Sequence, residues 1–285
     1  MKELIFDWTE LVAGHGFLEG PVDCGDSVVF TSINRGMLYR VPLQGGAVTP
    51  VAETGGGPNG VAINGDGVLW VAQNGGHVVP SRSMLEAVPS IQRVTPDGRV
   101  SVAMGTGLLA PNDCAFGPDG RLWFTDPHGS TIGVERRPGA LWALDTKSGE
   151  AEKILDGLAH PNGLVFGPGG DELFVGETHS GHIIRLRRNA RGWEHAGVYA
   201  TLEVGEPDGM AFDMDGRLWV AASAGDVIVV FGPGARDASL VRLGPSFPTN
   251  LCFAGADRRT LVVTLPKGGR VISARVDTAG LPLLC

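Results

Sequence analysis

The sequence predicts an all-β fold, a six-bladed β-propeller, and three observations lead to it. First, one sequence pattern recurs six times at intervals of 40 to 53 residues, which is the spacing of propeller blades. Second, short runs rich in Val, Leu, Trp and Thr alternate with Gly, Pro and Asp, as strands and turns do in all-β proteins. Third, the last repeat has room for only three strands, and a spare apolar stretch precedes the first repeat.

Each repeat begins with a polar residue, which we call the head of the repeat. The six heads are Glu19, Asn59, Asn112, Asn162, Asp208 and Asn250. A Gly/Asp-rich turn follows each head after about seven positions, and an apolar pair such as Leu122-Trp123 follows the turn. In the third repeat this pattern predicts four strands, at residues 114–116, 121–125, 140–144 and 151–155.

The ring is expected to close through the N-terminal part of the chain. The last repeat supplies strands at 251–253, 260–264 and 270–276, and the spare stretch at 4–8 is expected to pair with 270–276. Closure of this kind leaves no open sheet edge between the first and last blades. We therefore expect residues 1–285 to form a single propeller domain.

Bulk properties exclude several classes of function. The chain has 285 residues and a formal net charge of −8, which disfavours nucleic acid or an anionic membrane as partner. No stretch has the apolar length of a membrane helix, and the N-terminus carries acidic residues, unlike a signal peptide. The four cysteines are scattered and form no CxxC pair, so we expect reduced thiols and a cytoplasmic protein. The oligomeric state stays open.

The heads are expected to meet around the propeller axis. Strand one starts at the head and strand two returns antiparallel, so all six heads lie at one end of the innermost strands. A single Asn or Asp is often just a turn former, and for Asn59 and Asn250 this alternative is equally good. Glu19 has no such habit, and two carboxylates among amides are unfavourable inside a fold unless a positive charge lies between them.

A divalent cation is the simplest such charge. Carboxylate and amide oxygens suit calcium, magnesium or manganese, and zinc also accepts carboxylate oxygen. A cation held by few protein ligands keeps open positions, where it polarises a carbonyl or acidifies a water. The residues alone therefore predict a metal-centred propeller that is able to catalyse hydrolysis.

Four segments resemble the SMP-30/gluconolactonase/LRE family, whose members include regucalcin and bacterial sugar lactonases. They are EGP at Glu19, PND-x-x-x-x-PDGRLWFTDP at 111–127, PNGLVFGPGG-x-ELFVGET at 161–178 and PDGMAFDMDGRLWVA at 207–221. The resemblance implies a six-bladed propeller with one catalytic metal in its channel. It further implies that Glu19, Asn162 and Asp208 hold this metal, with Asn112 as a fourth ligand or a substrate contact. Asp208 would also act as general base or direct the attacking water, and Asp113 would bind substrate.

Two long connections between strands two and three, at 73–90 and 127–139, are expected to overhang the ring and set specificity. They carry Arg82, suited to a planar carboxylate, and His128, suited to proton transfer. For each of these two side chains, a solvated loop position is the alternative. Asn59, as a head, is a further candidate for substrate contact.

Three functions remain. The first is a divalent-metal-dependent lactonase that opens a sugar lactone-like or related cyclic ester by water attack on a metal-polarised carbonyl. Calcium is its first-choice metal, and zinc, manganese and magnesium are alternatives. The second is a phosphotriesterase on the same metal, resembling the diisopropylfluorophosphatase-like propellers. The third is a non-enzymatic metal-binding propeller scaffold. In the first two cases the partner is a small lactone or ester.

Overall fold

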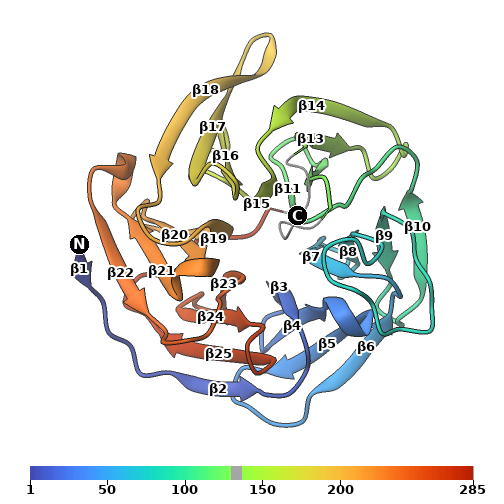
Figure 1. The fold of residues 1–285 in the computed structure, drawn as a ribbon, viewed down its shortest axis with the longest axis horizontal. Helices are drawn as coiled ribbons and strands as arrows, with labels where there is room; N and C mark the ends of the chain where they lie inside the picture. The colour runs from blue at the N-terminus through green and yellow to red at the C-terminus, as the bar shows by residue number, and fades with distance from the viewer. Residues whose placement is uncertain (130–136, 285) are drawn as a thin grey trace.

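Six β-sheets are arranged around a central channel in the computed structural model, which describes residues 1–129 and 137–284 (Figure 1). Each sheet is one blade, and its first strand lies nearest the channel (Figure 1). The predicted all-β, six-bladed propeller is confirmed.

The strands of the first three blades follow each other in chain order. The first blade consists of β3 (Leu18–Asp23), β4 (Ser27–Ser32), β5 (Met37–Pro42) and β6 (Thr49–Glu53). The second consists of β7 (Pro58–Ile63), β8 (Leu69–Gln73), β9 (Ser90–Val94) and β10 (Val100–Met104). The third consists of β11 (Cys114–Phe116), β12 (Leu122–Asp126), β13 (Gly139–Leu144) and β14 (Ala151–Leu158). The strands predicted for the third repeat thus agree with the structure to within three residues.

The last three blades are built in the same way, with N-terminal strands added to two of them. The fourth blade consists of β15 (Pro161–Phe166), β16 (Glu172–Glu177), β17 (His182–Asn189) and β18 (Gly192–Thr201). The fifth consists of β19 (Pro207–Phe212), β20 (Leu218–Ala222), β21 (Val227–Phe231), β22 (Ala238–Arg242) and β1 (Lys2–Glu3). The sixth consists of β23 (Asn250–Ala254), β24 (Thr260–Leu265), β25 (Arg270–Arg275) and β2 (Thr9–Val12).

Helical structure in the described residues is limited to three single 3₁₀ turns, at Ile33–Arg35, Ser223–Gly225 and Pro233–Ala235. No helix there is long and apolar enough to cross a membrane. The blades are held together by apolar packing of adjacent sheets, because the middle strands are buried on both faces. Between the third and fourth blades, for example, Trp123 packs edge-to-face on Phe166 and on Trp193.

Ring closure differs from the predicted one in the segment that provides it. The strand that pairs with β25 is β2, with Thr9 opposite Ser273, and not the stretch at 4–8. Residues 4–8 form no strand; Leu4, Phe6 and Trp8 instead pack on an apolar cluster of blades five and six. Alternating apolar residues occur in irregular segments that pack on a core as well as in strands. In this protein the strands on either side of the segment, β1 and β2, form the hydrogen bonds to blades five and six.

Candidate metal-binding site

The six heads lie at one end of the innermost strands and are all buried. In four blades the register between strands one and two shifts at the head or directly after it, as at a β-bulge. The shifts lie between Glu19 and Val22, Pro58 and Val61, Pro161 and Leu164, and Pro207 and Met210. A bulge bends its strand and re-aims a side chain, which is why bulges are common next to active sites. The repeated irregularity therefore turns these heads toward the axis.

Glycine follows the head in the same four blades because the next blade approaches closely there. A Cβ on Gly163 would lie 2.2 Å from the backbone oxygen of Asp208, and a Cβ on Gly209 would lie 2.0 Å from Oδ1 of Asn250. Each glycine thus makes room for the head of the following blade. In the third blade this position is Asp113 instead, which adds a carboxylate to the ring.

A second device, which the sequence did not reveal, fixes the head backbones. Threonine hydroxyls of one blade donate to the carbonyl oxygens at the head of the next. The pairs are Thr31 to Asn59, Thr125 to Asn162, Thr178 to Pro207 and Thr249 to Leu18, at 2.7–3.1 Å. No sequence motif near these threonines identifies their hydrogen-bond partners, which belong to the next blade. The role of the threonines in fixing the heads is therefore visible only in the folded structure.

Acidic side chains position the connections that lead into two heads. Asp126 accepts hydrogen bonds from the backbone N–H groups of Leu109 and Ala110, just before Asn112. Glu177 accepts from the N–H of Ala159, just before Asn162. Burial raises the pKa of Asp126 to about 6 although both N–H bonds favour its ionised form. These two carboxylates therefore fix the backbone conformation of the connections that precede Asn112 and Asn162.

Three buried carboxylates belong to the ring: Glu19, Asp113 and Asp208. The amide nitrogen of Asn250 donates to Oε2 of Glu19 at 3.1 Å and is 3.5 Å from Oδ2 of Asp113. Burial, followed by repulsion from both, raises the pKa of Asp208, and the nearby amide of Asn162 acts in the opposite direction. The structure therefore brings Asp113 together with the two predicted acidic ligands.

Burial raises the pKa of each ring acid, and repulsion between acids adds to it at Glu19 and Asp208. The pKa of Glu19 is raised to about 8, first by burial and then by Asp113. Burial raises the pKa of Asp113 to about 6, and burial followed by repulsion from Glu19 and Asp113 raises that of Asp208 well above its usual range. Within the described residues, no lysine, arginine or histidine contributes to these three shifts. Three buried acids without a basic partner are unfavourable unless a cation compensates them.

The donor set fits a divalent cation that prefers oxygen. Carboxylate and amide oxygens surround the axis, and Oδ1 of Asn59 is buried without any hydrogen-bond partner. Among the described residues, no three His, Cys, Asp or Glu side chains form a metal-binding group by themselves. The predicted set, Glu19, Asn162, Asp208 and Asn112, uses two carboxylates and two amides and so does not depend on such a group.

The other candidate residues differ in how close they come to the ring. Asn112 is buried at the head of the third blade, and its backbone oxygen accepts from the N–H of Gly60. Arg82 is exposed, and its loop is attached to the first blade through a bond from its N–H to the oxygen of Asn34. His128 is half-buried, and its Nδ1 has no hydrogen-bond partner among the described residues. Among the described residues, no hydrogen bond or ion pair joins Arg82 or His128 to a head, and part of the 127–139 connection lies outside them.

His160 is a site residue that the sequence did not suggest. It precedes Pro161 and Asn162, is 2% exposed, and adopts a left-handed backbone with φ 60°. Its ring lies 4.7 Å from that of His179, and burial lowers its pKa to about 3, so it is neutral. A bulky residue in this backbone region is strained, and such strain is concentrated at functional sites.

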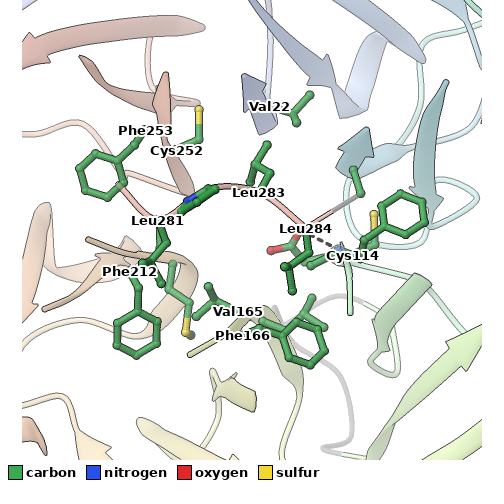
Figure 2. A pocket seen from close by; sticks show the side chains of 18 of the residues that line it. Val22, Cys114, Val165, Phe166, Phe212, Cys252, Phe253, Leu281, Leu283 and Leu284 are labelled. Carbon is green, nitrogen blue, oxygen red and sulfur yellow. Dashed lines mark hydrogen bonds between the residues drawn. The ribbon is translucent and has the colours of Figure 1, made fainter. Parts of the chain in front are cut away.

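Below the heads, the channel is apolar. A cavity of about 350 Å³ reaches from Asp113 and Asn250 down the inner strands and is lined by side chains such as Val165 and Phe166 (Figure 2). Leu281, Leu283 and Leu284 cross its far end (Figure 2). This segment is attached by bonds from the N–H of Leu281 to the oxygen of Phe212 and from the N–H of Gly280 to that of Arg258. The channel thus has one polar end and one apolar end.

The sequence is similar to those of known proteins. Residues 18–266 match the profile of the SMP-30/Gluconolactonase/LRE-like region. A gluconolactonase of Zymomonas mobilis is 27% identical over 244 residues, which cover 79% of this chain and 64% of the relative. Diisopropyl-fluorophosphatase of Loligo vulgaris is 30% identical over 178 residues, which cover 56% of this chain and 55% of that enzyme. The chain therefore matches less than two thirds of the length of these relatives.

Solved structures show the same architecture. A structure proposed to be a gluconolactonase superimposes with a TM-score of 0.80 at 28% identity, covering 97% of this chain and 94% of its own. A calcium-binding regucalcin of Agrobacterium tumefaciens superimposes with a TM-score of 0.81 at 17% identity, covering 99% of this chain and 98% of its own. The second likeness concerns the fold alone.

Proposed function

Because the chain belongs to the SMP-30/gluconolactonase/LRE-like family, we propose that it is a divalent-metal-dependent hydrolase that opens a lactone or related ester. One observation carries this proposal: three buried carboxylates lie among the heads with amides around them, and no basic side chain of the described residues compensates them. Metal-dependent ester hydrolysis needs a site of this kind, where a cation polarises the carbonyl and a carboxylate accepts a proton from water.

In this proposal Glu19, Asn162, Asp208 and Asn112 would hold the ion. When bound, a divalent ion supplies positive charge that polarises the ester carbonyl and keeps the neighbouring carboxylates ionised. Asp208 then accepts a proton from the attacking water, which is general-base catalysis. The amides of Asn59 and Asn112 donate hydrogen bonds to substrate oxygens, and Asp113 accepts one from a substrate hydroxyl.

The remaining chain orients these groups. The bonds from Thr125 and Thr178 fix the backbones of Asn162 and Pro207, so the heads of blades four and five keep a constant separation. Preorganised groups of this kind need little rearrangement as charge develops in the transition state. We infer that the threonines are positioning residues and that the heads do the chemistry.

The experiment is a metal-stripped protein assayed on lactones and aryl esters, with calcium, zinc, manganese and magnesium restored one at a time. We expect hydrolysis of at least one lactone to depend on a restored ion. Equal turnover with and without chelator would contradict the proposal, and a stable protein that turns over no substrate with any ion would favour the scaffold.

A phosphotriesterase is the second candidate, and the likeness to diisopropyl-fluorophosphatase supports it. The same ion and carboxylates suit attack on a phosphorus centre. The two candidates are separated by kcat/KM for a lactone and for a fluorophosphate, measured on one metal-loaded preparation.

A further inference from the structure

Two phenylalanines lie at the head end of the channel, next to the ring. Phe17 precedes Glu19 by two residues, and Phe247 precedes Asn250 by three. Their rings meet edge-to-face, with centroids 6.4 Å apart and planes at 70°. The side chains of Glu19 and Asn250 are themselves hydrogen-bonded, so the aromatic pair and this part of the ring belong to the same junction, between blades six and one.

The backbone of Phe247 is held in an unfavourable conformation that keeps its ring exposed. Its φ is 57°, a left-handed value that is strained for a bulky residue. Oδ1 of Asp226 accepts hydrogen bonds from the N–H groups of Ser246 and Phe247, at 2.9 and 2.8 Å. Despite this support the side chain remains 39% exposed. Core packing does not require such a residue, and glycine would fit the backbone better.

Exposed apolar side chains also occur in the connection that is hydrogen-bonded to the residue beside Phe17. Phe17 donates its N–H to Oδ1 of Asn34, whose backbone oxygen accepts the N–H of Arg82 in the 73–90 connection. That connection carries Met84 and Leu85, which are 96% and 50% exposed. Clustered exposed apolar residues mark places where a ligand or partner binds. The rim over blades four and five instead carries Glu177, Ser180 and Glu206.

We propose that Phe247, with Phe17 behind it, binds an apolar substituent of the substrate. The preferred substrate is then a lactone or ester that bears an alkyl chain, and not a polyhydroxylated sugar lactone. This assignment rests on the proposed function for the reacting group, since the ester lies at the ring while the chain lies on the phenylalanines. Phe247 is a specificity-determining residue and takes no part in proton transfer.

The test measures binding of two lactams, because a lactam keeps the shape of a lactone and resists hydrolysis. One lactam carries an alkyl chain and the other carries hydroxyl groups, and both are titrated calorimetrically into the calcium-loaded protein. We expect the alkyl lactam to bind more tightly. Phe247→Gly should weaken it about 10- to 100-fold, the effect of losing a buried aromatic contact, and leave the hydroxylated lactam unchanged.

Phe247→Gly should keep the wild-type melting temperature, because glycine adopts this backbone without strain. Val198→Ala, which truncates an exposed apolar residue on outer strand β18, is the matched control and should change neither affinity. Tighter binding of the hydroxylated lactam, or an equal loss for both lactams in Phe247→Gly, would overturn the inference. If the alkyl lactam binds as expected while no lactone or ester is hydrolysed, the inference stands and the proposed function fails.

Discussion

The two halves of the central channel are built from the same six strands and have opposite character. The head half gathers three acids and several amides, held by bulges, glycines and threonine bonds. The other half, one to four residues further along each strand, is lined by apolar side chains such as Val165 and Ala211. In an ordinary strand, polar and apolar side chains alternate and so separate onto the two faces of the sheet. In the inner strands of this protein, polar residues lie at one end of the strand and apolar residues at the other. Because all six blades share this arrangement, the charged side chains are confined to one end of the channel.

This difference shows what the irregular features contribute. Where the ladder is regular, the inner strands pack like any core strand. Where the register shifts, next to the heads, polar side chains are buried together at a cost that only a bound ion or substrate removes. If this division holds, substitutions in the head half should change activity most, and changes in the apolar half should mainly change stability.

The largest effect is expected for Asp208→Asn, which keeps size and a ligand oxygen but removes the charge and the base. We expect kcat to fall about 10²- to 10⁴-fold at saturating metal, the usual loss for a general base. Asp215→Asn, an exposed aspartate in the turn of the same blade, is the control and should leave kcat unchanged. Wild-type turnover of Asp208→Asn would show that the chemistry lies elsewhere.

The close approach of blades four and five can be tested with Gly163→Ala. Its Cβ would meet the backbone oxygen of Asp208 at 2.2 Å, so blade five must shift. We expect a destabilisation of about 1–3 kcal/mol, as for overpacking, together with a kcat about tenfold lower. Gly65→Ala is the matched control, because nothing lies within 4 Å of its Cβ. Equal behaviour of the two variants in denaturation and assay would contradict a role for this glycine.

Metal removal should give the protein an inverted pH dependence. The pKa of Glu19 is raised from 4.5 to about 8 in the folded protein, so the folded state retains a proton that the unfolded state has lost between these values. Stability should therefore fall as pH rises from about 5 to 8, and we expect the melting temperature in chelator to be about 5 °C lower at pH 8 than at pH 6.

Restoring the ion should abolish this slope, because a cation favours the ionised carboxylates. Glu19→Gln in chelator should also flatten it, since the titrating group is gone. A chelated wild-type protein that is most stable at pH 8 would mean that burial and the neighbouring acid do not raise the pKa of Glu19 in the folded state.

The smallest effect on activity is expected at the apolar end. A chain that stops at Gly280 lacks the leucines across the channel, including Leu281, which packs on the cluster around Phe212. We expect kcat within twofold of wild type, a melting temperature a few degrees lower and stronger binding of a hydrophobic dye. A large loss of kcat would show that the two halves are not independent.

The sequence predicted the repeat, the six heads and their convergence because each depends on local pattern and strand direction. It misplaced the closing strand, since Leu4, Phe6 and Trp8 alternate like a strand although they pack between sheets. It missed the threonine bonds and the constrained His160, because their partners come from other blades or from a backbone conformation without a residue signature. Features that follow from local pattern and strand direction were predictable, and the specific side-chain partners between blades were not.

The pairing of the N-terminal strands β1 and β2 with the last two blades has a consequence for folding kinetics. Residues near position 10 pair with residues near 272, so the ring closes through a contact of nearly the greatest sequence separation in the chain. Contacts of such separation form slowly, because the entropy of ordering the intervening chain must be overcome first. During synthesis on the ribosome, Phe6 and Trp8 emerge long before their partners in the last two blades exist. Closure is then the late step of folding, and the exposed N-terminal aromatics are where a nascent chain is most open to chaperones and to aggregation.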